Sequence, residues 1–280
     1  MKGTLWYCYA VASRSSPGAL DDVGGVSDTE VSAVRYNDLA AIVSPVPEAE
    51  FDESALRSGL EDIGWLESVA RAHNRVVDEV TRRGTALPFR LATIFRDHEA
   101  LTAMLAAREA ELLAALARVS GMVELGVKVY ASTASAPGAD DKADTGSTEP
   151  DARPGLSYLR RKKHERDTRE SGWRAAMEHA ITTDEALTAM SGGRRAHRPQ
   201  SPELTGISEQ NVLNVAYLVA GDDIDAFVAA AQRLQDESAA CRIEVTGPWA
   251  PYSFALDTAA GGAEGHEHQD GRDAVGAEPR

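Results

Sequence analysis

The sequence predicts an α+β protein built from two small domains. Short segments in which apolar and polar residues alternate, as in half-buried strands, lie beside longer segments with helical spacing of apolar residues. A stretch almost without large apolar residues separates two such sets, and the 280 residues are 43% hydrophobic, which is enough to build cores. We expect an N-terminal domain over 1–130, a disordered acidic linker over 131–157, a second domain over 158–256 and a disordered acidic tail over 257–280.

The first domain is predicted to begin with strands. Residues 4–11 are dense in aromatic and β-branched side chains, and the segment 13–25, rich in Ser, Gly and Asp, predicts a loop. Residues 31–36 and 39–43 flank Asn37-Asp38, two residues that tolerate left-handed backbone angles, which predicts a tight hairpin. The two prolines within 44–47 are expected to end it.

Two helices and a strand are predicted next. Over 52–83, one helical face carries Leu56, Leu60, Ile63, Leu66, Ala70, His73, Val77 and Val80. Gly84 is placed to cap that helix, and 85–95 is predicted as an extended connector or short strand. Asp97 can cap a second helix that reaches about Val119. Alternation over 123–129 predicts a strand that closes the first sheet, with both helices packed on one face of that sheet.

The second domain follows a segment of different composition. Residues 131–157 hold no aromatic residue and one large aliphatic one, Leu156, so they cannot bury enough surface to offset the entropy of ordering. We then predict a helix over 158–190, with Gly172 as the point where it could break, and a loop over 191–205. A strand over 212–219, a helix capped by Asp222 and a strand over 241–245 complete the unit.

Charge and cysteine usage exclude several classes of protein. The chain has 44 acidic and 29 basic residues, a net charge of −15, whereas binders of nucleic acid or anionic membranes gain affinity from excess Lys and Arg. Cys8 and Cys241 show no CxxC spacing, so neither a disulfide scaffold nor a zinc site is expected. The N-terminus lacks a signal-peptide pattern and no run of 18 apolar residues occurs, so we expect a cytoplasmic protein.

Candidate catalytic residues are isolated ones, because no nucleophile elbow, phosphate loop, dinucleotide fingerprint or HExxH pattern occurs. His73 could act as a base, although a core-edge histidine bonded to a carbonyl is the favoured interpretation. Arg90 and Arg96 bracket 89–95 and could form an anion pocket, but pairing with acidic helix residues is favoured. His266 and His268 in the tail could hold a metal only weakly. We expect no cofactor and no metal.

Two further segments are candidates for binding other molecules. Residues 160–174 hold seven Lys or Arg against three Asp or Glu, which could dock an acidic partner or nucleic acid, although a solvated helix face is the usual meaning of such a run. Residues 247–254 present three aromatic side chains on a proline-stiffened segment, which packs either on the protein itself or on another chain. The candidate partner-binding residues there are Gly247, Pro248, Trp249, Pro251, Tyr252 and Phe254.

Taken in order, several motifs resemble the gas vesicle accessory family GvpL/GvpF. The first domain contributes AIVSPVP (41–47), Trp65-Leu66, ARAHN (70–74) with Val76-Val77, LPFR (87–90) with TIF (93–95), and ELGVKVY (124–130). The second contributes Tyr158-Leu159 before basic residues, LNVAYLV (213–219) and TGPWAPYSF (246–254), which is the most specific motif. The chain departs from the family at Ala250, where proline is frequent, and in its long acidic linker.

The resemblance implies two domains, the first a modified ferredoxin-like unit and the second a related one. It also implies a non-enzymatic role in the assembly of gas vesicles, the hollow protein shells that give cells buoyancy. The implied partners are the small hydrophobic shell protein and other accessory proteins, and the implied location is the gas vesicle or the cytoplasm. The residues do not distinguish an F-like from an L-like member.

Two other classes of function stay open at this point. An enzyme on a ferredoxin-like scaffold would use His73 with Arg90 or Arg96, and it predicts a deep pocket that holds these side chains together. An RNA-binding module would need exposed aromatic residues on its sheet, flanked by basic ones. Trp6, Tyr7 and Tyr9 are the aromatic candidates, but the chain lacks the basic spacing that such modules show.

Overall fold

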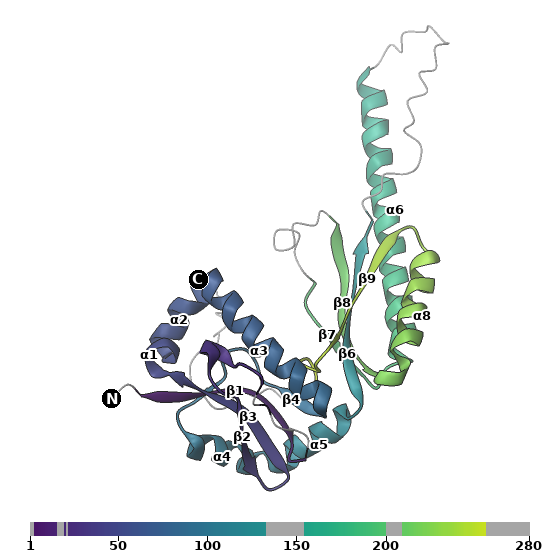
Figure 1. Cartoon of the computed structure of the whole chain (residues 1–280). Coiled ribbons are helices and arrows are strands. Elements are labelled where there is room, and N and C mark those ends of the chain that lie inside the picture. The colour runs from purple at the N-terminus through teal and green to yellow at the C-terminus, as the bar shows by residue number, and fades with distance from the viewer. Residues whose placement is uncertain (1–2, 16–19, 21, 133–153, 200–208, 256–280) are drawn as a thin grey trace, which may run out of the picture.

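The computed structural model describes residues 3–15, 20, 22–132, 154–199 and 209–255. It confirms an α+β fold with two antiparallel sheets (Figure 1). The first sheet has the order β2-β3-β1-β4, with β5 also paired to β1; these strands are β1 (Thr4–Ser13), β2 (Ser32–Tyr36), β3 (Leu39–Pro47), β4 (Ala86–Pro88) and β5 (Ile94–Phe95). The second sheet has the order β7-β8-β6-β9, with β6 (Met122–Ala131), β7 (Gly193–Ala196), β8 (Gln210–Ala220) and β9 (Cys241–Trp249).

The strand β6 belongs to the second sheet, so the prediction that it closes the first sheet is wrong. It pairs along its length with β8 on one side and with β9 on the other. Alternation of apolar residues shows that one face of a strand is buried, but it does not show which strands lie beside it. The chain therefore enters the second sheet between Val119 and Met122, ahead of residue 130, where we predicted the domain boundary.

Helices cover both faces of the first sheet, not one face as predicted. α3 (Ile63–Arg83) packs on the side of Tyr7 and Tyr9, while α4 (His98–Ala107) and α5 (Glu109–Val119) pack on the side of Cys8 and Val11. The pairing of β1 with β3 contains a β-bulge between Cys8 and Ala10, where Tyr9 has no partner of its own. Because of this bulge, Ala10 lies on the same face of the sheet as Tyr7 and Tyr9. The unbroken apolar run of β1 is typical of a strand that is buried on both faces.

The hairpin is confirmed, but its second strand is longer than predicted. Asn37 has a φ of 46° in the turn between β2 and β3. β3 continues through Pro45 to Pro47 and pairs with β1 over that stretch. β2 pairs with β3 only as far as Val43. Beyond Val43 no described strand accepts hydrogen bonds from that edge of β3, so proline, which has no N–H group, fits there.

Both long helices that we predicted are divided in the structure. The segment 48–83 forms α1 (Glu48–Phe51), α2 (Glu53–Glu61) and α3, because Asp62 accepts hydrogen bonds from the N–H groups of Gly64 (2.9 Å) and Trp65 (3.1 Å) and starts a new helix. The predicted cap at Asp97 is confirmed by its bond from the Ala100 N–H at 2.8 Å. The helix that Asp97 begins ends at Ala107, and Arg108 separates it from α5.

The cap at Asp62 allows a direct test of this local interpretation. Asp62→Ala is expected to lower the free energy of unfolding by about 1 kcal/mol, because two N–H groups at the start of α3 lose their acceptor. Glu185→Ala, which removes an exposed carboxylate that caps no helix, should change it by less than about 0.5 kcal/mol. Urea unfolding followed by circular dichroism measures both. Equal effects would contradict a capping role.

The second sheet has helices on one face. α6 (Pro154–Thr188) runs without interruption through Gly172, and α8 (Ile224–Asp236) begins after Asp223, one residue later than the predicted cap. Both helices pack on the face that carries Leu125, Val127 and Tyr217. β7 lies where we predicted a loop, because its four residues, GRRA, do not alternate. Of the predicted linker, 133–153 lie outside the described residues and 154–157 belong to α6; the tail from 256 also lies outside them.

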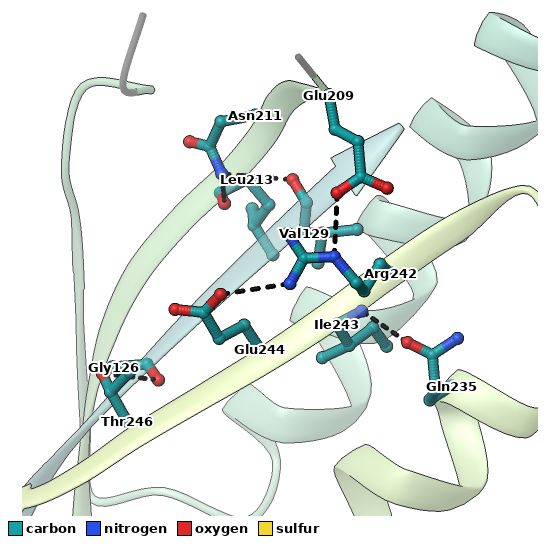
Figure 2. A network of polar contacts seen from close by, with 10 residues as sticks. All are labelled: Gly126, Val129, Glu209, Asn211, Leu213, Gln235, Arg242, Ile243, Glu244 and Thr246. Carbon is teal, nitrogen blue, oxygen red and sulfur yellow. Dashed lines mark hydrogen bonds and ion pairs between the residues drawn. The ribbon is translucent and has the colours of Figure 1, made fainter. Parts of the chain in front are cut away.

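A polar network spans β6, β9 and the residues before β8 (Figure 2). The Arg242 guanidinium donates to Glu209 (2.8 Å) and Glu244 (3.1 Å) and lies 4.3 Å from the centre of the Tyr130 ring. At the outer edge of β9, the Gln235 side chain accepts from the Ile243 N–H (2.5 Å) and donates to the Cys241 carbonyl (3.1 Å). These bonds occupy backbone groups that an edge strand otherwise leaves open. Within the described part of the chain, no helix is both long and apolar enough to cross a membrane.

Candidate functional site

The segment 247–254 joins the second sheet to the first domain. β9 is longer than predicted and includes Gly247, Pro248 and Trp249, and the chain then turns across the first domain. Gly247 has a φ of +115°, and a Cβ there would lie 2.8 Å from the Glu124 carbonyl oxygen, so both the backbone angle and the space favour glycine. The six candidate residues of this segment divide into two groups with different environments.

Trp249 faces solvent together with its two neighbours in the strand. Its side chain is 54% exposed, and Gly247 and Pro248 are exposed as well. Trp249 is the most exposed of the Trp, Tyr and Phe side chains described, ahead of Trp173 at 38% and Tyr252 at 36%. Trp249 is therefore the member of the segment that is best placed to contact another molecule.

The other three candidates hold the segment to the rest of the protein. The Tyr252 hydroxyl donates to Asn74 Oδ1 (3.1 Å) on α3, and Ser253 donates to the Glu124 carboxylate from its N–H and its hydroxyl (both 2.7 Å). Burial, together with the Asp78 and Glu124 carboxylates, raises the pKa of Tyr252, which keeps this hydroxyl as a donor. Pro251 is buried.

Phe254 is the deepest of these contacts. It is 5% exposed and packs in one core cluster with Ala216 and Leu218 of β8 and with apolar residues of β1, β3, α4 and α5. Its carbonyl accepts from the Arg118 guanidinium at 3.0 Å. Sequence reasoning missed the partners Asn74, Arg118 and Glu124, because no local pattern marks a polar residue whose partner lies more than a hundred residues away.

A cavity of about 650 Å³ lies beside Trp249. The end of α3, the start of β4, the end of α5 and the start of β6 form one side of it, and Pro248 to Pro251 form the other. The wall of the cavity is apolar at Val119, Met122 and Val123. It also carries a negative charge at Asp78 and a positive charge at Arg82. The cavity and Trp249 together are the candidate site.

His73 lies outside this cavity and is buried in an aromatic cluster. It is 1% exposed, and its Nδ1 lies 3.1 Å from the Tyr7 hydroxyl, which also accepts from the Ala92 N–H. Burial lowers the pKa of His73 to about 4, and the Phe89 backbone offsets this only in part. Nε2 has no hydrogen-bond partner among the described residues. The imidazole is thus a neutral core group at neutral pH. The sequence favoured a histidine at the edge of the core that bonds a carbonyl, whereas the Nδ1 atom lies within hydrogen-bond distance of the Tyr7 hydroxyl.

The alternative functions find no support in this geometry. Arg90 and Arg96 are exposed, His73 is buried, and none of the three lines the cavity, so the pocket that the enzyme alternative requires is not formed by them. Tyr7 and Tyr9 are fully buried, and the Trp6 ring lies 3.9 Å from that of His98. These three candidate side chains therefore form no open aromatic platform for RNA bases. His266 and His268 lie outside the described residues.

Comparison with known proteins gives a consistent result. The sequence model of the family described as "Gas vesicle synthesis protein GvpL/GvpF" matches residues 5–256. Gas vesicle protein L of Streptomyces sp. (strain CB03234) is 36% identical over 252 residues, which cover 90% of this chain and 92% of that protein. Gas vesicle protein F of the same strain is 30% identical over 255 residues, with 89% and 98% covered.

Solved structures agree with the fold. The crystal structure of the gas vesicle protein GvpF from Anabaena sp. PCC7120 has a TM-score of 0.62 at 17% sequence identity, and the match covers 95% of this chain and 100% of that one. GvpF from Microcystis aeruginosa has a TM-score of 0.61 at 16% identity, with 90% and 99% covered. Because the family match extends over nearly all of the described residues, this chain belongs to the GvpL/GvpF family of gas vesicle synthesis proteins.

Proposed function

We propose that this protein is a non-enzymatic assembly factor of gas vesicles that binds the hydrophobic shell protein, and other accessory proteins, through the face around Trp249. Family membership supports the gas vesicle role. The observation that carries the binding site is the 54% exposed Trp249, which lines the cavity on a segment held in place by the bonds of Ser253 to Glu124 and by the buried Phe254. We further propose that it acts in the cytoplasm and at the growing vesicle.

The physical basis is protection of a partner that would otherwise aggregate. A small shell protein with an apolar, sheet-forming surface associates with itself unless another molecule covers that surface. A rigid aromatic side chain beside a partly apolar cavity is a common anchor for such a surface. The net charge of −15 keeps the complex in solution while it forms.

Trp249→Ala is expected to weaken binding to the shell protein at least about 30-fold, the effect of losing an anchor worth about 2 kcal/mol. Copurification of shell protein co-expressed with the variant measures this, and vesicle yield in cells that carry the variant as their only copy gives the functional readout. Ile181→Ala is the matched control, because Ile181 is 56% exposed on α6, away from the cavity.

Two variants together separate a direct role of the segment in binding from a role in holding its own structure in place. If Trp249→Ala and Tyr252→Ala both keep the fold and bind the shell protein as well as the wild type does, the segment is excluded as the binding surface. If Tyr252→Ala alone lowers binding together with thermal stability, its bond to Asn74 acts by holding the segment in place.

A further inference from the structure

The side chains that the structure describes in the first half of α6 belong to no core. The buried side chains described in this helix lie in its second half, at Ala176, Ala180, Thr183 and Leu187. Before Trp173, all the side chains that the structure describes are exposed, and Figure 1 shows this half extending beyond the second sheet. We call residues 154–174 the arm. A helix gains most of its stability in proteins from packing, so an arm of this length suggests a surface that packs on another molecule.

The arm carries the opposite charge from the rest of the protein. Residues 160–174 hold seven basic and three acidic residues, a charge of +4, so the other residues sum to −15 − 4 = −19. Lys162, Arg166 and Trp173 are spaced by four and seven residues, which places them on one side of the helix. Trp173 is 38% exposed. The arm thus presents positive charge that leads to an open aromatic ring.

A surface of complementary chemistry lies at α1, α2 and the start of α3. Residues 48–63 hold six acidic residues and one basic one, Arg57. Leu60 and Ile63 are 51% and 81% exposed on the same segment, and no other large apolar residue described is as exposed as Ile63. We call residues 48–63 the acidic corner. Exposed apolar side chains surrounded by charge are typical of surfaces that bind another protein.

The arm and the acidic corner lie at opposite ends of the molecule (Figure 1). They are therefore unable to meet within one copy. We propose that the arm of one copy docks on the acidic corner of a second copy, with Trp173 against the apolar side chains of Leu60 and Ile63. Because the two surfaces differ, a chain of copies always keeps a free arm at one end and a free acidic corner at the other, and the contact builds an open chain of molecules.

Added salt should affect this contact in the opposite direction from non-specific association between the copies. Two copies of charge −15 repel each other, so non-specific association should strengthen when salt screens that repulsion. Docking of a positive arm on a negative corner should instead weaken as salt is added. Sedimentation velocity of the full chain over a range of protein concentrations, at low and at high salt, distinguishes the two.

Charge reversal tests the two surfaces separately. Lys162→Glu with Lys163→Glu and Arg166→Glu, or Glu48→Lys with Glu50→Lys and Glu61→Lys, should each weaken self-association at least about tenfold, as expected for three exposed ion pairs. Asp52 and Asp62 are left intact because they cap helices. Arg35→Glu with Arg195→Glu and Arg233→Glu makes the same change in net charge as the arm reversal, −6, at exposed positions away from the arm, and it should leave self-association unchanged.

The combined variant, with both triple reversals, restores opposite charges and should recover self-association to near the wild-type level. A wild type that stays monomeric at every concentration and salt overturns the proposal. So does an arm reversal, or a corner reversal, that leaves self-association unchanged, and so does an arm that binds single-stranded DNA without self-association. Circular dichroism of each variant confirms that loss of association is not loss of fold.

Discussion

Phe254→Ala is expected to lower the free energy of unfolding by about 3–5 kcal/mol, the cost of removing a buried phenylalanine from a packed core. Phe254 is 5% exposed and contacts residues of both the first domain and β8. It approaches the chain so closely that a Cβ on Gly193 would lie 3.1 Å from its ring. The surrounding residues come from two rigid sheets, so they have little freedom to collapse into the space left by the ring.

Urea unfolding followed by both fluorescence and circular dichroism measures this effect. Because Phe254 packs between two units, the variant should also make them unfold in separate transitions, whereas the wild type should show one. Val228→Ala on α8, where the side chain is 42% exposed, is the control and should cost less than about 1 kcal/mol. A cost below that of the control would show that Phe254 does not join the two units.

Acidification from pH 7 to pH 4 is expected to cost the wild type about 3 kcal/mol of stability through His73 alone. The pKa of His73 falls from 6.5 to about 4 in the folded protein, because burial disfavours the charged imidazole. Between these values the unfolded chain binds a proton that the folded chain does not. The stability that neutral His73 contributes is therefore complete above pH 6.5 and is lost as the pH falls toward 4.

A comparison with His73→Asn isolates this effect from the titration of the many carboxylates. Both proteins carry the same acidic residues, so the difference between their unfolding free energies should shrink by about 3 kcal/mol between pH 7 and pH 4. Urea unfolding at a series of pH values measures it. Parallel curves for the two proteins over this range would mean that His73 takes up its proton equally well in the folded and unfolded states.

Local features of the fold were predictable from the sequence. The Asn37-Asp38 hairpin, the Asp97 cap, the end of a helix at Gly84 and most of the long strands follow from residue types and spacing within a few positions of each other, whereas β7 lies where we predicted a loop. The family was also evident from short motifs in order. The break at Asp62 was within reach too, since aspartate is among the residues most favoured at the N-cap of a helix.

What the sequence by itself determined is therefore most of the elements, the α+β class and the family, because each rests on contacts between near neighbours or on ordered motifs. Only the tertiary structure decided that β6 lies in the second sheet, that helices cover both faces of the first, and that Trp249 is open while Phe254 is buried. These outcomes depend on which surfaces meet between segments that lie far apart in the sequence, such as Met122 and Ala220 in the pairing of β6 with β8. A pattern of apolar residues records that a face is buried, but it does not record what buries it.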